Sequence, residues 1–71
     1  MEVTIQRLAM AYQGNLVEVR GRTGQVFRGI ADGVNQRRGM FLRTSPFSRV
    51  FIPFFLITSI FLLSRRRRSF F

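Results

Sequence analysis

The stretch of sequence that decides the fold is VFIPFFLITSIFLL, which runs from Val50 to Leu63. As a helix it would span about 21 Å, which is shorter than the ~30 Å hydrocarbon core of a bilayer. As a single strand it would extend about 46 Å, which is too long for one straight strand in so small a chain. Pro53 cannot donate a hydrogen bond to a β-ladder, so we expect the run to break there into two strands. A membrane span and a buried helix are the alternatives.

The composition restricts the classes of protein to which the chain can belong. It contains no cysteine and no histidine, so it lacks thiolate metal ligands, disulfides and the commonest general base. Its three carboxylates, Glu2, Glu18 and Asp32, are scattered along the sequence. Paired-acid catalysis and a carboxylate metal cage are therefore not expected. We predict a non-enzymatic protein without a cofactor or a metal.

Length and hydrophobicity together predict self-association. The 71 residues are expected to form one domain, residues 1–64, followed by an Arg-rich, Phe-ended tail at residues 65–71. A domain of this size buries only about 60% of the surface of its unfolded chain. Yet 46% of the residues are hydrophobic and nine are phenylalanines, more than a monomer of this length easily buries. Because large exposed apolar patches usually mark interfaces, we expect a homo-oligomer.

The charge balance indicates an acidic partner. All twelve basic residues are arginines, and the net charge is +9. RNA or another polyanion is therefore a candidate partner. The alternative is that the arginines provide solubility and stack on aromatic rings between subunits. The candidate nucleic-acid-binding residues are Arg22, Asp32, Asn35, Arg37, Arg38, Arg65, Arg66, Arg67 and Arg68, although Asp32 and Asn35 also suit turns.

The periodicity predicts one helix followed by five strands. In residues 4–13, Ile5, Leu8, Ala9 and Tyr12 fall on one face of a helix, with Thr4 as a possible N-cap. From residue 16 the period changes to two, as in half-buried strands. Gly29, in the middle of a strand, suggests the strong bending that a small barrel needs. The predicted strands are residues 16–20, 25–33, 40–44, 49–53 and 56–63. The expected fold is mainly β: a short helix and a five-stranded, closed or nearly closed barrel.

Two motifs in this order resemble those of a known family. The first is VEVRGRTGQVFRGI at residues 17–30, and the second is FIPFFLITSI at residues 51–60. They are similar to the two motifs of the Sm-like (SH3-like) barrel, found in eukaryotic Sm proteins and in the bacterial Sm-like RNA chaperone. The resemblance covers about residues 5–63. It implies a ring or filament in which the fourth and fifth strands of neighbouring subunits pair edge to edge.

The RNA-binding positions of that family are only partly matched. Family members that bind RNA typically carry an aspartate and, four residues later, an asparagine, whereas Asp32 and Asn35 are three residues apart. An Arg-Gly pair usually follows the fourth strand, and Ile52–Pro53 stands in its place. The chain also resembles short Sm-like proteins of spore-forming bacteria, which carry a similar Ile-Pro at this point.

Three functions remain open at this point. The first is a self-assembling structural protein, and the second is an RNA-binding Sm-like ring that uses its arginines. The third is a single-pass membrane peptide, although a membrane partner is not expected. The predicted location is cytoplasmic because residues 1–10 lack a signal-peptide pattern, with deposition in a spore or surface assembly as the alternative. The candidate self-association residues are Phe51, Ile52, Phe54, Phe55, Ile57, Ile60, Leu62, Phe70 and Phe71.

Overall fold

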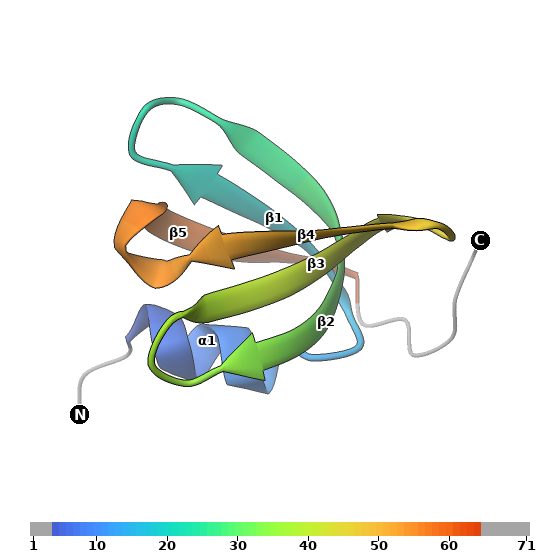
Figure 1. Cartoon of the computed structure of the whole chain (residues 1–71), viewed down its shortest axis with the longest axis horizontal. Helices are drawn as coiled ribbons and strands as arrows, with labels where there is room; N and C mark the ends of the chain where they lie inside the picture. The colour runs from blue at the N-terminus through green and yellow to red at the C-terminus, as the bar shows by residue number, and fades with distance from the viewer. Residues whose placement is uncertain (1–3, 65–71) are drawn as a thin grey trace.

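One short helix precedes five antiparallel strands in the computed structural model, which describes residues 4–64 (Figure 1). The predicted tail at 65–71 lies outside the described residues. The mainly β fold, with one N-terminal helix, is as predicted. The elements are α1 (Ile5–Ala11), β1 (Leu16–Gly21), β2 (Val26–Asn35), β3 (Gly39–Ser45), β4 (Ser48–Pro53), the 3₁₀ turn η1 (Phe54–Leu56) and β5 (Ile57–Ser64).

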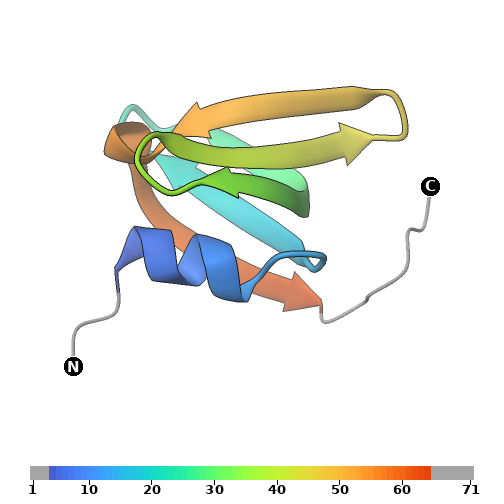
Figure 2. The same ribbon diagram turned by 60° about the horizontal axis from the view of Figure 1, so that its bottom comes forward.

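The five strands form one strongly curled sheet with the order β4-β3-β2-β1-β5. Among the described residues, β4 pairs only with β3, and β5 pairs only with β1. Of the closed or nearly closed barrel that we expected, full closure is therefore wrong: the sheet ends in two edge strands that do not hydrogen-bond to each other. The 3₁₀ turn carries the chain from one edge of the sheet to the other (Figure 2).

The apolar run breaks at Pro53, as predicted. Pro53 is the last residue of β4, and η1 separates it from β5. The turn is fixed to the rest of the sheet because the Phe54 N–H donates to the Arg38 carbonyl at 2.9 Å. No helix within residues 4–64 has the length and apolar character required to cross a membrane.

The helix packs as its periodicity predicts. Thr4 is its N-cap, and the Thr4 hydroxyl accepts a hydrogen bond from the Arg7 N–H at 3.2 Å. Ala9 is fully buried, and Ile5, Leu8 and Tyr12 pack against the core beside it. Through these contacts α1 lies against β5 and β2. A helix of seven residues is too short to be stable alone, so its stability comes from this packing.

At Gly29, β2 and β3 approach each other closely where the sheet curls. A Cβ atom at this position would overlap the backbone carbonyl of Arg43 on β3. Only glycine leaves enough space there, which agrees with the bending predicted from the sequence. A bulge further along β2, between Ala31 and Val34, contains Gly33 with a φ of 120°.

The core lies on the concave face of the sheet. Val17 and Val19 of β1 are fully buried there, whereas Glu18 between them points to the outer face. This alternation is the period of two that the sequence shows. The buried hydrophobic residues are Ala9, Val17, Val19, Ala31, Met40, Leu42, Ile52, Phe54, Ile57 and Ile60.

Candidate functional site

Three turns meet at the end of the molecule where η1 lies (Figure 1). Arg22, in the turn between β1 and β2, donates its backbone N–H to the Leu56 carbonyl at 2.9 Å and its Nε–H to the Phe55 carbonyl. The turn between β2 and β3 reaches the same place through the bond from the Phe54 N–H to the Arg38 carbonyl. The structure thus brings Arg22 to the same end of the molecule as Arg37 and Arg38, which belong to a different turn.

A depression of about 360 Å³ lies at this end of the molecule. We call it the turn-end depression; it is lined by Arg37, Arg38, Phe51, Pro53 and Phe55. The Phe55 side chain is 70% exposed. Within residues 4–64, the guanidinium groups of Arg37 and Arg38 have no hydrogen-bond or ion-pair partner. The depression therefore combines exposed aromatic rings with uncompensated positive charge.

Asn35 shapes the turn beside the depression. Its Oδ1 accepts hydrogen bonds from the backbone N–H groups of Arg37 at 3.1 Å and Arg38 at 3.2 Å. This is the local side-chain-to-backbone bonding that stabilises turns. The turn reading of Asn35 thus has direct support in the structure.

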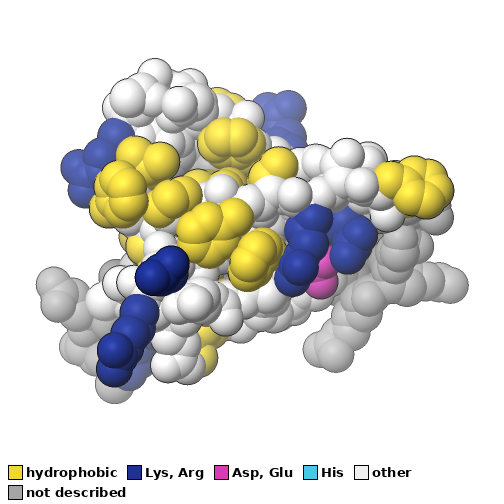
Figure 3. Space-filling model, viewed as in Figure 1, with side chains coloured by type: hydrophobic (Ala, Val, Ile, Leu, Met, Phe, Trp, Pro, Cys, Tyr) yellow, Lys and Arg dark blue, Asp and Glu magenta, His cyan; other side chains and the backbone are white. Residues whose placement is uncertain are grey.

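Asp32 lies apart from Asn35, on the outer face of the sheet. Its carboxylate pairs with Arg43 at 2.8 Å and with Arg49 at 3.3 Å. The Arg49 guanidinium lies over the Phe41 ring, 4.1 Å from the ring centroid. Figure 3 shows the acidic group between two basic groups, beside hydrophobic side chains gathered over β3 and β4. Asp32 thus links β2 to β3 and β4, and it does not line the turn-end depression.

The apolar run presents two different sets of side chains. Four of the predicted self-association residues have side chains in the core of the single chain: Ile52, Phe54, Ile57 and Ile60. Leu62 also packs against this core, and the remaining candidates in the described residues, Phe51 and Phe55, are exposed. Phe70, Phe71 and Arg65–Arg68 lie outside the described residues.

The outward-facing residues of β5 were not among the self-association residues predicted from the sequence. Phe61 is 44% exposed and Leu63 is 47% exposed, on the edge strand that pairs only with β1. The signal that identifies them is the period of two: Ile60 and Leu62 face the core, so Phe61 and Leu63 must face outward. Both edge strands therefore carry exposed apolar side chains.

A charged cluster on β1 and β2 was also missed. The Glu18 carboxylate is mostly buried and accepts hydrogen bonds from Arg28 Nε at 2.8 Å and Arg20 Nε at 2.7 Å. The bond from Arg28, followed by the bond from Arg20, holds the pKa of Glu18 below its ordinary value of 4.5. The Arg20 guanidinium also lies 4.8 Å from the centroid of the Phe61 ring. The spacing of Glu18 and Arg20, two residues apart on one strand, is the only part of this cluster that sequence reasoning could have found.

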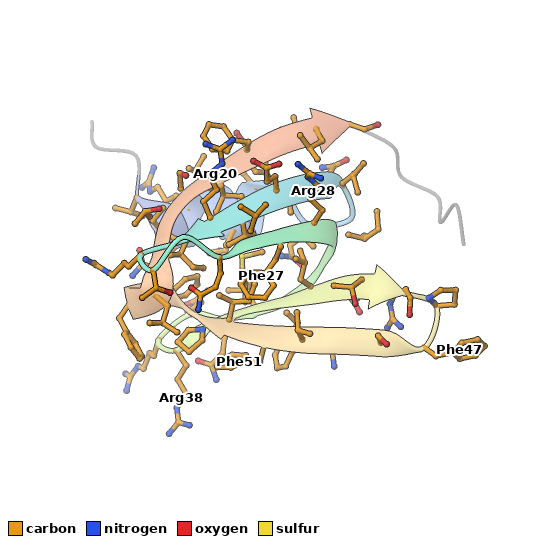
Figure 4. The ribbon with its side chains drawn as sticks, turned by 90° about the horizontal axis from the view of Figure 1, so that it is seen from above. Arg20, Phe27, Arg28, Arg38, Phe47 and Phe51 are labelled. Carbon is orange, nitrogen blue, oxygen red and sulfur yellow. The ribbon has the colours of Figure 1, made fainter. Side chains whose placement is uncertain are left out.

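Phe47, which sequence reasoning did not single out, occupies the tip of the hairpin formed by β3 and β4. Its side chain is 97% exposed, and it points away from the sheet (Figure 4). Ser45 pairs with Ser48, so Pro46 and Phe47 form a two-residue loop. The sequence signal was the Ser-Pro-Phe-Ser segment between two alternating stretches.

Metal-ligating residue types are sparse in residues 4–64, which contain two carboxylates, Glu18 and Asp32, and no histidine or cysteine. No group of three or more acidic, histidine or cysteine residues in this part of the chain is arranged to hold a metal ion. Comparison with protein-family models, with curated proteins and with solved structures finds no match to this chain.

Proposed function

We propose that this chain is a non-enzymatic, Sm-like assembly protein that forms a ring or a fibre. The observation that carries the proposal is that the sheet has two open edges, β4 and β5. An edge strand presents a row of unpaired N–H and C=O groups, which a strand of another chain can pair with. Pairing β4 of one copy with β5 of the next would give each subunit two neighbours.

The side chains beside the edges support the same contact. Phe51 and Phe55 are exposed at or next to β4, and Phe61 and Leu63 are exposed on β5. Burying a large apolar side chain contributes about 1.5–3 kcal/mol, so several such residues add substantially to backbone pairing. Pro53 at the end of β4 cannot donate a hydrogen bond, so we place the pairing along residues 48–52.

The symmetry of this contact determines the kind of assembly. Because β4 and β5 are different surfaces, their pairing is heterologous. Such contacts close into a ring when the rotation between subunits divides a full turn, and otherwise continue as a helical filament. The order of one helix and five bent strands, with edges at β4 and β5, supports the Sm-like fold proposed here.

Electron microscopy of purified, nuclease-treated protein tests the proposal. We expect rings or fibres that persist after the nuclease treatment. Dispersed particles the size of a single 8.3 kDa chain would contradict it.

The turn-end depression favours a second candidate function, binding of RNA by the assembled protein. Arg37 and Arg38 provide unpaired positive charge next to exposed Phe51 and Phe55. Proteins that bind single-stranded nucleic acid combine positive charge with aromatic rings on which bases stack. Titration of a fluorescent single-stranded RNA tests this function, and binding that survives removal of both arginine charges would contradict it.

A further inference from the structure

We infer that Phe47 of one chain docks into the turn-end depression of a second chain. The role assigned to this contact, joining assemblies, rests on the proposed function, but the docking of Phe47 itself does not require pairing of β4 with β5. It rests on three observations: the way Phe47 is presented, the chemistry of the depression, and the distance between them.

The loop that carries Phe47 is held in place by several interactions. Pro46 restricts φ to about −65°, which preorganises the turn. The Ser45 hydroxyl accepts a hydrogen bond from the Phe47 N–H at 3.3 Å, and Arg43 donates to the Pro46 carbonyl at 3.3 Å. Arg43 is itself bound to Asp32. The ring is therefore presented on an anchored hairpin, so less backbone freedom is lost when it binds.

The chemistry of the turn-end depression suits an aromatic ring. Phe51, Pro53 and Phe55 provide apolar walls, and Arg37 and Arg38 stand beside them. Guanidinium groups stack on aromatic rings. Pairs of aromatic rings also gain interaction energy in addition to that from burying apolar area. This chain already contains both kinds of contact, between Arg49 and Phe41 and between Phe41 and Phe51. A phenylalanine side chain is thus a matched occupant.

Phe47 cannot fill the depression of its own chain. The lining residues Phe51 and Pro53 lie four and six residues further along the chain, about 13 Å and 20 Å from Phe47 at ~3.3 Å per residue. Figure 4 shows Phe47 at the tip of the hairpin, with Phe51 and Arg38 toward the other end. The occupant must therefore come from a second copy, which makes the contact head-to-tail.

The small area of the contact defines its role. One aromatic side chain buries about 150–250 Å², far below the 1,200–2,000 Å² of a standard stable interface. A single contact between two free chains is therefore weak. Many such contacts between assembled chains act together, because linked sites raise each other's effective concentration. We assign Phe47 to joining assemblies to one another rather than to building them.

Photo-crosslinking tests the inference directly. The probe is p-benzoylphenylalanine in place of Phe47, which keeps an aromatic ring, in an equimolar mixture of ¹⁵N-labelled and unlabelled full-length chains. We expect crosslinked peptides of mixed isotope composition that join residue 47 to the lining of the depression. Crosslinks that map to other surfaces, or only within one chain, would overturn the inference.

Two substitutions in the probe-carrying chain sharpen the test. Phe55→Ala removes a largely exposed ring from the depression and should lower the crosslink yield about fivefold or more. Val26→Ala is the matched control, because Val26 is 51% exposed and lies on the strand face around Glu18, outside the depression; it should leave the yield unchanged. Equal yields from the two variants would overturn the inference.

A third variant separates this inference from the proposed function. Leu63→Asp places a charge on the edge strand β5 and leaves both Phe47 and the depression intact. The crosslinked positions should be the same in this variant. If the parent forms an oligomer without crosslinks at the depression, the docking of Phe47 is wrong and edge pairing stands. If Leu63→Asp leaves the oligomer unchanged while the crosslinks persist, edge pairing is wrong and the docking stands.

Discussion

Arg20 lies over the ring of Phe61, with its guanidinium carbon 4.8 Å from the ring centroid, while its Nε–H donates to Glu18 at 2.7 Å. The exposed ring on the edge strand β5 is thereby linked to the neighbouring strand β1. Glu18 and Phe61 are also direct partners in the pairing of β1 with β5. A side chain that is already ordered loses less entropy when another chain packs on it, which favours β5 as a binding edge.

The Glu18 cluster predicts a loss of stability in acid. The pKa of Glu18 in the folded chain lies below its ordinary value of 4.5, because Arg28 and then Arg20 hydrogen-bond the carboxylate. The stabilisation is therefore fully present above about pH 4.5 and is lost as the pH falls through the lowered pKa. Urea unfolding at about pH 7 and about pH 3 measures the difference.

Glu18→Gln is the control for this prediction. The amide cannot ionise, so this variant should be less stable than the parent at neutral pH and should lose less stability in acid. If the two proteins lose equal stability between the two pH values, Glu18 is not the source of the pH dependence.

Gly29→Ala should destabilise the fold strongly. The added Cβ would overlap the Arg43 carbonyl, which is backbone and cannot move without shifting β3. Overpacking of this kind typically costs about 1–3 kcal/mol or more. Thermal or urea unfolding gives the magnitude.

Gly21→Ala is the matched control, because its Cβ would meet the side-chain oxygen of Gln25, 2.7 Å away, at the end of a flexible side chain. We expect a clearly smaller loss of stability for this variant. Equal losses for the two variants would contradict the close strand approach at Gly29.

Replacement of both Arg37 and Arg38 by Gln tests the polyanion site. Each phosphate contact contributes about −0.7 to the slope of log affinity against log salt for a single strand. Loss of two contacts should therefore make the slope shallower by about 1.4. Titration of single-stranded RNA at several salt concentrations measures it.

The corresponding double Lys variant keeps the charge and should keep the slope. An unchanged slope in the Gln variant would place the phosphate contacts elsewhere on the chain.

The elements of the fold were largely predictable because they depend on local patterns. Pro53 breaks the apolar run, and the period of the apolar residues changes from helix to strand where the structure places these elements. Whether the barrel would close was not predictable, and the structure shows an open sheet, because pairing between strands distant in sequence depends on the curl of the whole sheet.

The candidate surfaces were predictable only in part. Arg37 and Arg38 were expected in an exposed turn, and they lie there. The bond from Arg22 to the Phe55 carbonyl joins residues 33 positions apart, so no local pattern contains it. The inward orientation of Ile52 and Ile60 follows from strand register, which a continuous apolar run conceals.

Leu63→Asp tests the edge contact without disturbing the core. Leu63 is 47% exposed, so a charge there should change the stability of the single chain by only about 0.5 kcal/mol. If the contact with β4 of another copy buries this position, the same charge would weaken the association by several kcal/mol. Analytical ultracentrifugation should show a marked shift toward monomer.

Val26→Asp is the matched control. Val26 is similarly exposed, but it lies on β2, which has a neighbouring strand on both sides and is not an edge strand. Its oligomer should match that of the parent. An intact oligomer for Leu63→Asp, or equal dissociation of both variants, would argue against pairing through β5.

The most direct test of self-assembly is the molar mass of nuclease-treated protein, measured by light scattering at about 50 mM and about 500 mM salt. Apolar strand pairing does not weaken with salt, and salt screens the repulsion between subunits of net charge +9. We therefore predict an oligomer of equal or greater mass at the higher salt. A chain that becomes monomeric after nuclease treatment, or at high salt, would contradict assembly through its own edge strands and would make the polyanion the element that holds subunits together.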